Sequence, residues 1–225
     1  MASPDSSTRP QTEEMVIVHN VFRSNLEALP DLIRAVADGD RGRAAVLTGW
    51  LTELITGLHH HHTGEDELMW PLLTSRAPAD NALVLRMEEQ HARIADLVSV
   101  VHAQATAFTT SGSRSAGASL AASITELNGV LAEHLGEEEA RILPIVEQVM
   151  TPAEWKVLAD RGNASIPKDR RLTFLGFMLY TASDSQRTLL MSQLPAPARV
   201  MWRLIGKRSF AKAYQEIYGV APAWR

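Results

Sequence analysis

The sequence carries eight histidines, and four of them form two pairs of nearly equal spacing. The separations are 42 and 43 positions, and the pairs are His19 with His61 and His91 with His134. In each pair the second histidine is followed four positions later by a glutamate, Glu65 or Glu138. A proline stands ten positions after that histidine, at Pro71 and Pro144. The chain therefore contains an internal repeat, and each copy supplies two imidazoles and one carboxylate.

Helical geometry would bring the members of each copy together. An α-helix rises ~1.5 Å per residue, so a chain that runs away from His19, turns and runs back returns to its level near His61. Residues four positions apart lie on one face of a helix, so each His-x-x-x-Glu points its imidazole and its carboxylate the same way. Two such hairpins packed together would gather four imidazoles and two carboxylates inside a helical bundle.

Burying these polar groups without partners would be unfavourable. An unsatisfied polar group loses about 2–7 kcal/mol on transfer to an apolar interior, and two buried carboxylates also repel each other. A bound cation removes both penalties. Imidazole with carboxylate suits iron, manganese or zinc, whereas the absence of cysteine disfavours copper(I) and structural zinc. Six protein ligands exceed the needs of one tetrahedral zinc ion and suit two metals that share bridging carboxylates.

The elements that must position these residues are predicted to be helices. Apolar residues recur every three or four positions over long windows, and no stretch alternates with the period of two that a half-buried strand requires. The expected helices cover Met15–Asp38, Arg43–His62 with a continuation to Pro71, Ala79–Thr109, and Ser119–Met150. Pro30 should bend or split the first helix, and Thr110–Gly117 should form a flexible surface connection. We therefore predict an all-α fold, an up-down-up-down four-helix bundle.

The bundle is expected to span residues 14–150, between a disordered N-terminus (1–13) and a C-terminal helical appendage (151–225). Thr151 and Pro152 suit the N-cap and the first position of a helix, and two more helical pieces are expected over about Lys168–Ser183 and Pro197–Tyr218. The appendage holds most of the aromatic residues, so we expect it to pack on the bundle. It would act there as a lid that shields one end of the bundle or as an output surface.

Composition and charge exclude several classes of protein. With 45% apolar and 21% charged residues, the 225-residue chain is neither collagen-like nor disordered. It has no cysteine, no signal-peptide pattern and no membrane-spanning run, so we expect a cytoplasmic protein without a membrane or nucleic-acid partner. The net charge of −4 divides into −11 up to Thr151 and +7 beyond it, which favours docking of the appendage on the bundle. A partner protein, a membrane or a nucleic acid is the alternative target of the basic part.

The pattern resembles the hemerythrin-like, or HHE cation-binding, family of non-haem di-iron four-helix bundles. The matching elements are His19, His61-His62-Thr63-Gly64-Glu65, Leu68-Met69-Trp70-Pro71, Glu89-Gln90-His91, His134-Leu135-Gly136-Glu137-Glu138 and Ile142-Leu143-Pro144. They cover about Glu14–Met150. The resemblance implies that one iron binds His19 and His61 and that the other binds His91 and His134. It also implies that Glu65 and Glu138 bridge the two irons together with an oxo or hydroxo group.

The sequence departs from the dioxygen carriers of this family. On their third helix the carriers have a second histidine four positions after the first, where this chain has Ala95, and on the fourth helix they have an aspartate one position beyond Glu138. With four histidines and two glutamates, both metals would keep exchangeable positions. We therefore predict reaction with hydrogen peroxide, dioxygen or nitric oxide in oxidative or nitrosative stress, with catalase-like turnover as the enzymatic form. The alternatives are an iron or dioxygen sensor without catalysis and a metal-free interaction bundle.

Adjacent histidines make the register of the second helix ambiguous. His62 with Asp66 has the same spacing as His61 with Glu65, but only the latter pair reproduces the repeat. We assign His61 as the ligand and keep His62 as a candidate for an additional ligand or a near neighbour of the metals.

The other polar residues near these motifs are predicted to have ordinary roles. His59 and His60 should lie at the bundle surface, and His102 should be a plain helix residue. Glu137 and Glu139 flank a ligand and should face solvent. The sequence contains no nucleophile elbow, phosphate-binding loop or dinucleotide fingerprint.

Overall fold

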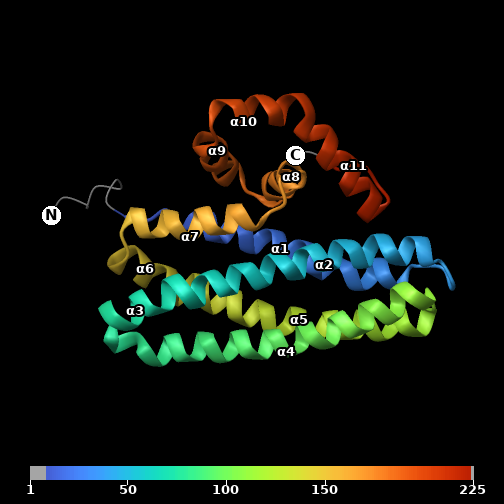
Figure 1. Ribbon diagram of the computed structural model, residues 1–225, viewed down its shortest axis with the longest axis horizontal. Helices are drawn as coiled ribbons and strands as arrows, with labels where there is room; N and C mark the ends of the chain where they lie inside the picture. Colours follow the sequence, from blue (N-terminus) through green and yellow to red (C-terminus); the bar gives the residue numbers. More distant parts are fainter. Residues whose placement is uncertain (1–8, 224–225) are drawn as a thin grey trace.

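The computed structural model describes residues 9–223, and within that range all regular secondary structure is helical (Figure 1). The all-α prediction is confirmed. Four long helices run side by side along the longest axis, and consecutive ones run in opposite directions. They are α1 (Glu13–Arg34), α2 (Arg41–Gly64), α4 (Asn81–Ser111) and α5 (Arg114–Glu137). A short 3-10 helix, η3 (Pro78–Asp80), precedes α4.

The second and fourth helices of the bundle each contain a π-helical turn, which the sequence analysis did not foresee. Helix α2 continues through η2 (Glu65–Met69) into α3 (Trp70–Arg76), and α5 continues through η4 (Glu138–Ile142) into α6 (Leu143–Val149). Each π turn begins at the glutamate of a His-x-x-x-Glu, and a proline stands at the start of the helix that follows. The internal repeat of the sequence is thus also a repeat of backbone structure. Isolated π turns are frequent at functional sites.

Pro30 does not split α1 into two helices, because α1 is continuous from Glu13 to Arg34. A proline has no N–H to donate to the carbonyl four residues earlier, which here belongs to Leu26. That carbonyl instead accepts a hydrogen bond of 2.9 Å from Nδ2 of Asn128 on α5. A neighbouring helix therefore supplies the missing donor.

The prediction of a flexible surface connection over Thr110–Gly117 is wrong. Helix α4 extends to Ser111 and α5 begins at Arg114, so only two residues join them. Gly112 adopts φ +63°, a left-handed conformation that glycine tolerates, and Ser113 caps α5 through the backbone N–H of Ala116. The serines and glycine of this segment thus specify a tight helix–helix turn.

Two apolar clusters fill the bundle, and the predicted site lies between them along every long helix. One cluster includes Val21, Leu58, Ile94 and Leu135. The other includes Met15, Met69, Met87 and Ile142. In each helix the candidate ligands fall between a member of one cluster and a member of the other. A polar layer therefore crosses the core, and apolar side chains exclude water on both sides of it.

The appendage consists of five α-helices and a π turn, and it begins as predicted. Thr151 caps α7 in a capping box with Glu154, and Pro152 is its first residue. The elements are α7 (Pro152–Ser165), α8 (Arg171–Thr181), α9 (Asp184–Gln193), α10 (Ala196–Met201), η5 (Trp202–Gly206) and α11 (Lys207–Tyr218). Helix α9 was not expected, although its capping box of Ser183 and Gln186 can be read from the sequence.

The appendage lies on the α1–α2 side of the bundle (Figure 1). Arg170 forms an ion pair of 2.8 Å with Glu53 of α2, and Arg161 of α7 pairs with Glu67 of η2 at 2.5 Å. Arg43 of α2 donates to the last-turn carbonyls of α11. In the two ion pairs a basic group of the appendage meets an acidic group of the bundle, as the uneven charge distribution suggests. Among the described residues no helix is long and apolar enough to cross a membrane.

Candidate metal centre

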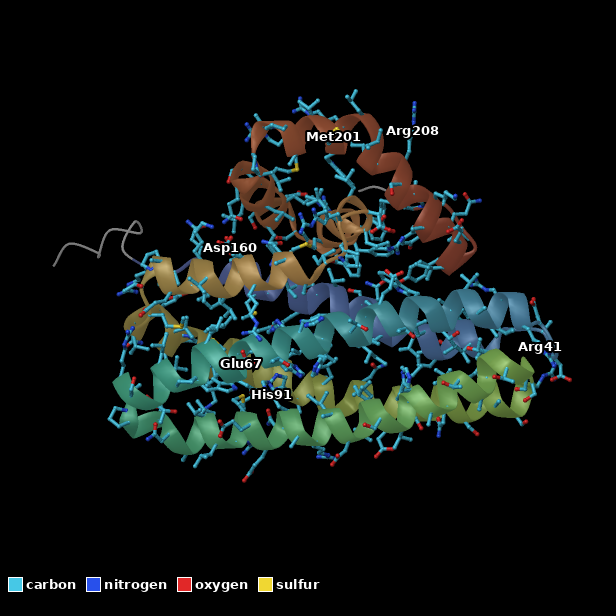
Figure 2. All side chains as sticks on the ribbon, viewed as in Figure 1. Arg41, Glu67, His91, Asp160, Met201 and Arg208 are labelled. Carbon is cyan, nitrogen blue, oxygen red and sulfur yellow. The ribbon has the colours of Figure 1, made fainter. Side chains whose placement is uncertain are left out.

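All six predicted ligands and His62 come together in the polar layer between the two apolar clusters. The residues His19, Glu65, His134 and Glu138 are completely buried, and His62 and His91 are 6% exposed. His61 is slightly more accessible, with 10% of its side chain exposed. Figure 2 shows His91 directed into the bundle interior. The ligand-type atoms fall into two groups that share Glu65, and within each group they lie within 4.8 Å of one another.

The first group contains His19, His61, Glu65 and Glu138. The Nε2 atoms of His19 and His61 face each other at 3.0 Å. Oε1 of Glu65 lies 3.1 Å from Nε2 of His61, and Oε2 of Glu138 lies 3.3 Å from Nε2 of His19. Each imidazole of this group therefore approaches one of the two carboxylates.

The second group contains His62, Glu65, His91 and His134. The Nε2 atoms of His91 and His134 are 3.2 Å apart, and Oε2 of Glu65 is 3.4 Å from His91. Glu138 also approaches this group, since its Oε2 is 3.8 Å from Nε2 of His134. The ring of His62 stacks on that of His91 with a centroid distance of 4.0 Å. Both glutamates thus reach towards both groups, as bridging ligands would.

The hydrogen bonding of this layer is incomplete without a cation. All four carboxylate oxygens of Glu65 and Glu138 are buried, and none has a hydrogen-bond partner of normal geometry among the described residues. Nε2 of His62 is buried and unpartnered in the same way. Native proteins rarely leave buried polar atoms unsatisfied, because each one carries a desolvation penalty of about 1–3 kcal/mol. Converging nitrogen and oxygen atoms whose lone pairs are not used in hydrogen bonds are what a metal ion requires, so the residues fit a cation.

The pKa values of the buried carboxyls and of several histidines are also shifted because these groups are buried close together. Burial, together with the neighbouring Glu65, raises the pKa of Glu138 to about 8, and burial also raises the pKa of Glu65. Burial and nearby imidazoles lower the pKa of His61 and His62, and lower that of His134 to about 2. Burial thus keeps His61, His62 and His134 neutral, with their nitrogen lone pairs available, beside two carboxyls that resist ionisation unless a cation is bound.

Comparison with known families agrees with this geometry. A family model for the hemerythrin HHE cation binding domain matches residues 11–146, which is more than half of the chain. The chain belongs to this family. HHE domains bind metal cations, typically iron, and both groups of candidate ligands lie within the matched region. The search of curated proteins and the search of solved structures gave no match.

The HHE domain orients three of its histidines through hydrogen bonds at the nitrogen that faces away from the two groups. Nδ1 of His19 lies 2.8 Å from Glu139, Nδ1 of His91 lies 2.7 Å from Asp66, and Nδ1 of His134 lies 3.1 Å from Oε1 of Gln90. An acceptor at Nδ1 holds the proton there and leaves Nε2 free for a metal, and it also strengthens the imidazole as a ligand. The fourth histidine of the repeat, His61, has no such partner among the described residues.

These supporting residues are anchored in turn. Glu139 accepts a hydrogen bond of 2.9 Å from Arg23, and Asp66 accepts one of the same length from the indole of Trp70. Gln90 donates to Glu137 at 3.0 Å. Fixed polar groups therefore support His19, His91 and His134 from outside the HHE site, whereas His61 has no such support among the described residues.

The expectation that Glu137 and Glu139 face solvent is wrong. Glu139 supports His19, and the side chain of Glu137 is only 12% exposed because Gln90, Arg86 and Arg141 surround it. The other ordinary roles agree with the structure: His59, His60 and His102 are exposed helix residues.

Sequence reasoning missed Asp66 and Gln90 as supporting residues. Asp66 was considered only as a partner for His62, and the signal that it contributes to the site is its position next to the shared ligand Glu65. Gln90 precedes His91 directly and has no sequence signal of its own. Its contact with His134 depends on how α4 and α5 pack.

Proposed function

We propose that this HHE domain holds two non-haem iron ions and reacts there with small oxidants, of which hydrogen peroxide is the leading candidate and dioxygen and nitric oxide are others. The observation that carries the proposal is the pair of buried ligand groups joined by Glu65 and approached by Glu138. Two metals are favoured over one because five imidazoles and two carboxylates exceed one coordination sphere and fall into two sets. We place this activity in the cytoplasmic response to oxidative or nitrosative stress.

The two groups offer unequal numbers of imidazoles, which supports reaction at one metal. The fifth histidine that carriers have on the third helix is absent at Ala95, yet His62 on α2 brings an imidazole to the second group. The second group then supplies three imidazoles and the first group two. An exchangeable position is therefore expected beside His19 and His61.

Iron held in this layer supplies the change of oxidation state that conversion of two H₂O₂ to O₂ and two H₂O requires. The chain's own residues keep the reacting volume small and dry, because the apolar clusters close it on both sides. Glu139, Asp66 and Gln90 hold protons on the outer nitrogens of three ligands, so that these imidazoles stay fixed in one orientation.

Metal analysis combined with peroxide turnover tests the proposal. The purified protein should contain two irons per chain, absorb in the near ultraviolet and evolve dioxygen from hydrogen peroxide. Glu65→Ala should lose metal and activity, because Glu65 belongs to both groups, while His59→Ala at the exposed neighbouring position should keep both. Two bound irons without turnover would reject catalysis in favour of iron or dioxygen binding, and a metal-free protein of full stability would reject the metal centre itself.

A further inference from the structure

The appendage and the outer face of α1 and α2 form a partly open cavity of about 520 Å³. Figure 1 shows α7 running along these two helices and α8, seen nearly end-on, crossing them. Cavities that hold small organic ligands have volumes of about 300–1,000 Å³. This one touches the metal centre at a single ligand, since His61 is part of its lining.

The walls of the cavity are mainly apolar and aromatic. Phe22, Trp155, Phe174 and Met178 contribute to them. Flat ligand rings pack well against aromatic and thioether side chains.

The charged groups of the lining are largely matched. Arg170 and Glu53 pair with each other at 2.8 Å, and Arg161 pairs with Glu67 at 2.5 Å. Both arginines are thus already neutralised, and Glu14 adds a carboxyl whose pKa is raised by burial. The cavity therefore favours a neutral ligand over an anionic one.

One donor group of the lining lacks an acceptor. Nδ1 of His61 makes no hydrogen bond to the described residues, in contrast to the same atom in His19, His91 and His134. The indole N–H of Trp155, in contrast, interacts with the carboxyl of Glu14. A ligand that leaves such a donor as that of His61 unpaired loses affinity, whereas one with a suitably placed acceptor oxygen gains it.

We propose that this cavity binds a neutral aromatic molecule whose carbonyl oxygen accepts a hydrogen bond from Nδ1 of His61. The ligand would complete the outer layer of acceptors that the other three histidines receive from the chain. Because an acceptor at Nδ1 strengthens an imidazole as a metal ligand, occupancy of the cavity tightens metal binding, and metal binding tightens the ligand by the same factor. This coupling rests on the proposed metal centre, but binding in the cavity does not.

Calorimetric titration with a matched pair of probes tests the cavity. The probes are 1-tetralone and tetralin, which differ by a ketone oxygen, and the full-length protein is titrated both metal-free and loaded with Mn(II). We expect both probes to bind the metal-free protein. In the Mn(II) protein, where the metal holds Nε2 of His61 and the proton stays on Nδ1, 1-tetralone should bind at least 10-fold more tightly than tetralin. Saturating 1-tetralone should raise Mn(II) affinity several-fold.

Variants of α7 localise the binding. Ala159→Trp fills the cavity and should abolish binding of both probes, whereas Val157→Trp adds the same ring at an exposed position of the same helix outside the lining and should leave it intact. Thr56→Trp, at an exposed position of the lining on α2, replaces Ala159→Trp if the latter fails to fold.

Three results would overturn the proposal. They are unchanged binding in the filled variant, equal affinity of the two probes for the Mn(II) protein, and tighter binding of 1-naphthoate, which would indicate an anion site. If the protein takes up no Mn(II), the metal centre fails separately, and the effect of Ala159→Trp on the metal-free protein still decides whether the cavity binds aromatic molecules.

Discussion

Oδ1 of Asp66 lies 2.7 Å from Nδ1 of His91, although 25 positions separate the two residues in the sequence. The same oxygen accepts a hydrogen bond of 2.9 Å from the indole of Trp70. One carboxylate oxygen thus fixes a candidate ligand on α4 and a buried tryptophan of α3. Together with Glu65, Asp66 raises the pKa of His91 to about 9 against the effect of burial.

Replacing Asp66 should weaken the metal centre without removing a ligand. We expect Asp66→Ala to lower metal affinity about 10- to 100-fold, the usual effect of losing a partner of a ligating histidine. Competition with a chelator of known affinity measures the change. Glu67→Ala is the control, because Glu67 is the next residue and pairs with Arg161 rather than with a candidate ligand. Equal affinities of the two variants would contradict the assigned role of Asp66.

His62 should be needed for the second metal. Its Nε2 is buried and unpartnered, and its ring stacks on that of His91. His62→Phe keeps an aromatic ring in that place but removes the nitrogen, so the metal content should fall from two per chain towards one. His59→Phe at an exposed position of the same helix should retain two. Metal analysis after gel filtration distinguishes these outcomes, and a full complement in His62→Phe would show that His62 is only a neighbour of the metals.

The repeat in the sequence indicated where the six candidate ligands would gather. This prediction was possible because the gathering depends only on the rise of a helix and on the four-residue spacing of one helix face. The layer around them could not be predicted in the same way. Glu139 follows a ligand directly in the sequence, and its side chain reaches His19 because α1 packs beside this part of the fourth helix, which is not local information.

The assignment of His62 illustrates a second limit of prediction from the sequence. Adjacent helix residues point about 100° apart, which suggests that only one of His61 and His62 can serve the site. In the structure each serves a different group, because the shared carboxylate of Glu65 lies between them. Which of two adjacent residues faces a ligand depends on the packing of four helices, and this information is not local to the sequence.

Metal binding should release protons at neutral pH. In the metal-free protein burial raises the pKa of Glu138 to about 8, so this carboxyl is largely protonated at pH 7, and it must ionise to bind a cation. Metal affinity should therefore rise with pH and level off above about pH 8 to 9, where Glu138 and His91 have lost their protons. Titration calorimetry in buffers of different ionisation enthalpy counts the protons released. An enthalpy independent of the buffer would show that the carboxyls are already ionised.

Gly176 should be essential for the packing of the appendage. A Cβ atom at this position of α8 would lie 2.4 Å from Cβ of Phe210 on α11, a clash that no rotation of the Phe210 side chain relieves. We expect Gly176→Ala to lower the free energy of unfolding by about 1–3 kcal/mol, the usual effect of overpacking. Gly162→Ala on α7 meets no atom within 4 Å and should instead stabilise the protein by up to about 1 kcal/mol through helix propensity. Urea unfolding measures the free energy of unfolding of both variants and shows whether one is destabilised and the other stabilised.

Glu154 should contribute to stability in a defined range of acid pH. Its hydrogen bonds with Arg76 and Thr151 lower its pKa to about 2, and the pair with Arg76 at 2.7 Å joins α7 to the end of α3. A carboxyl whose folded-state pKa is depressed stabilises the protein fully above its unfolded-state value of about 4.5, and this contribution is lost as the pH falls towards 2.

The melting temperature of Glu154→Gln should therefore lie below that of the wild type at pH 6, and the difference should shrink between pH 4.5 and pH 2. Asp160→Asn on the same helix removes only an exposed pair with Lys156, so its effect should be a few tenths of a kcal/mol. A Glu154→Gln difference that is the same at pH 6 and pH 2 would mean that the side chain acts through its neutral capping contacts with Thr151 and not through the charge it shares with Arg76.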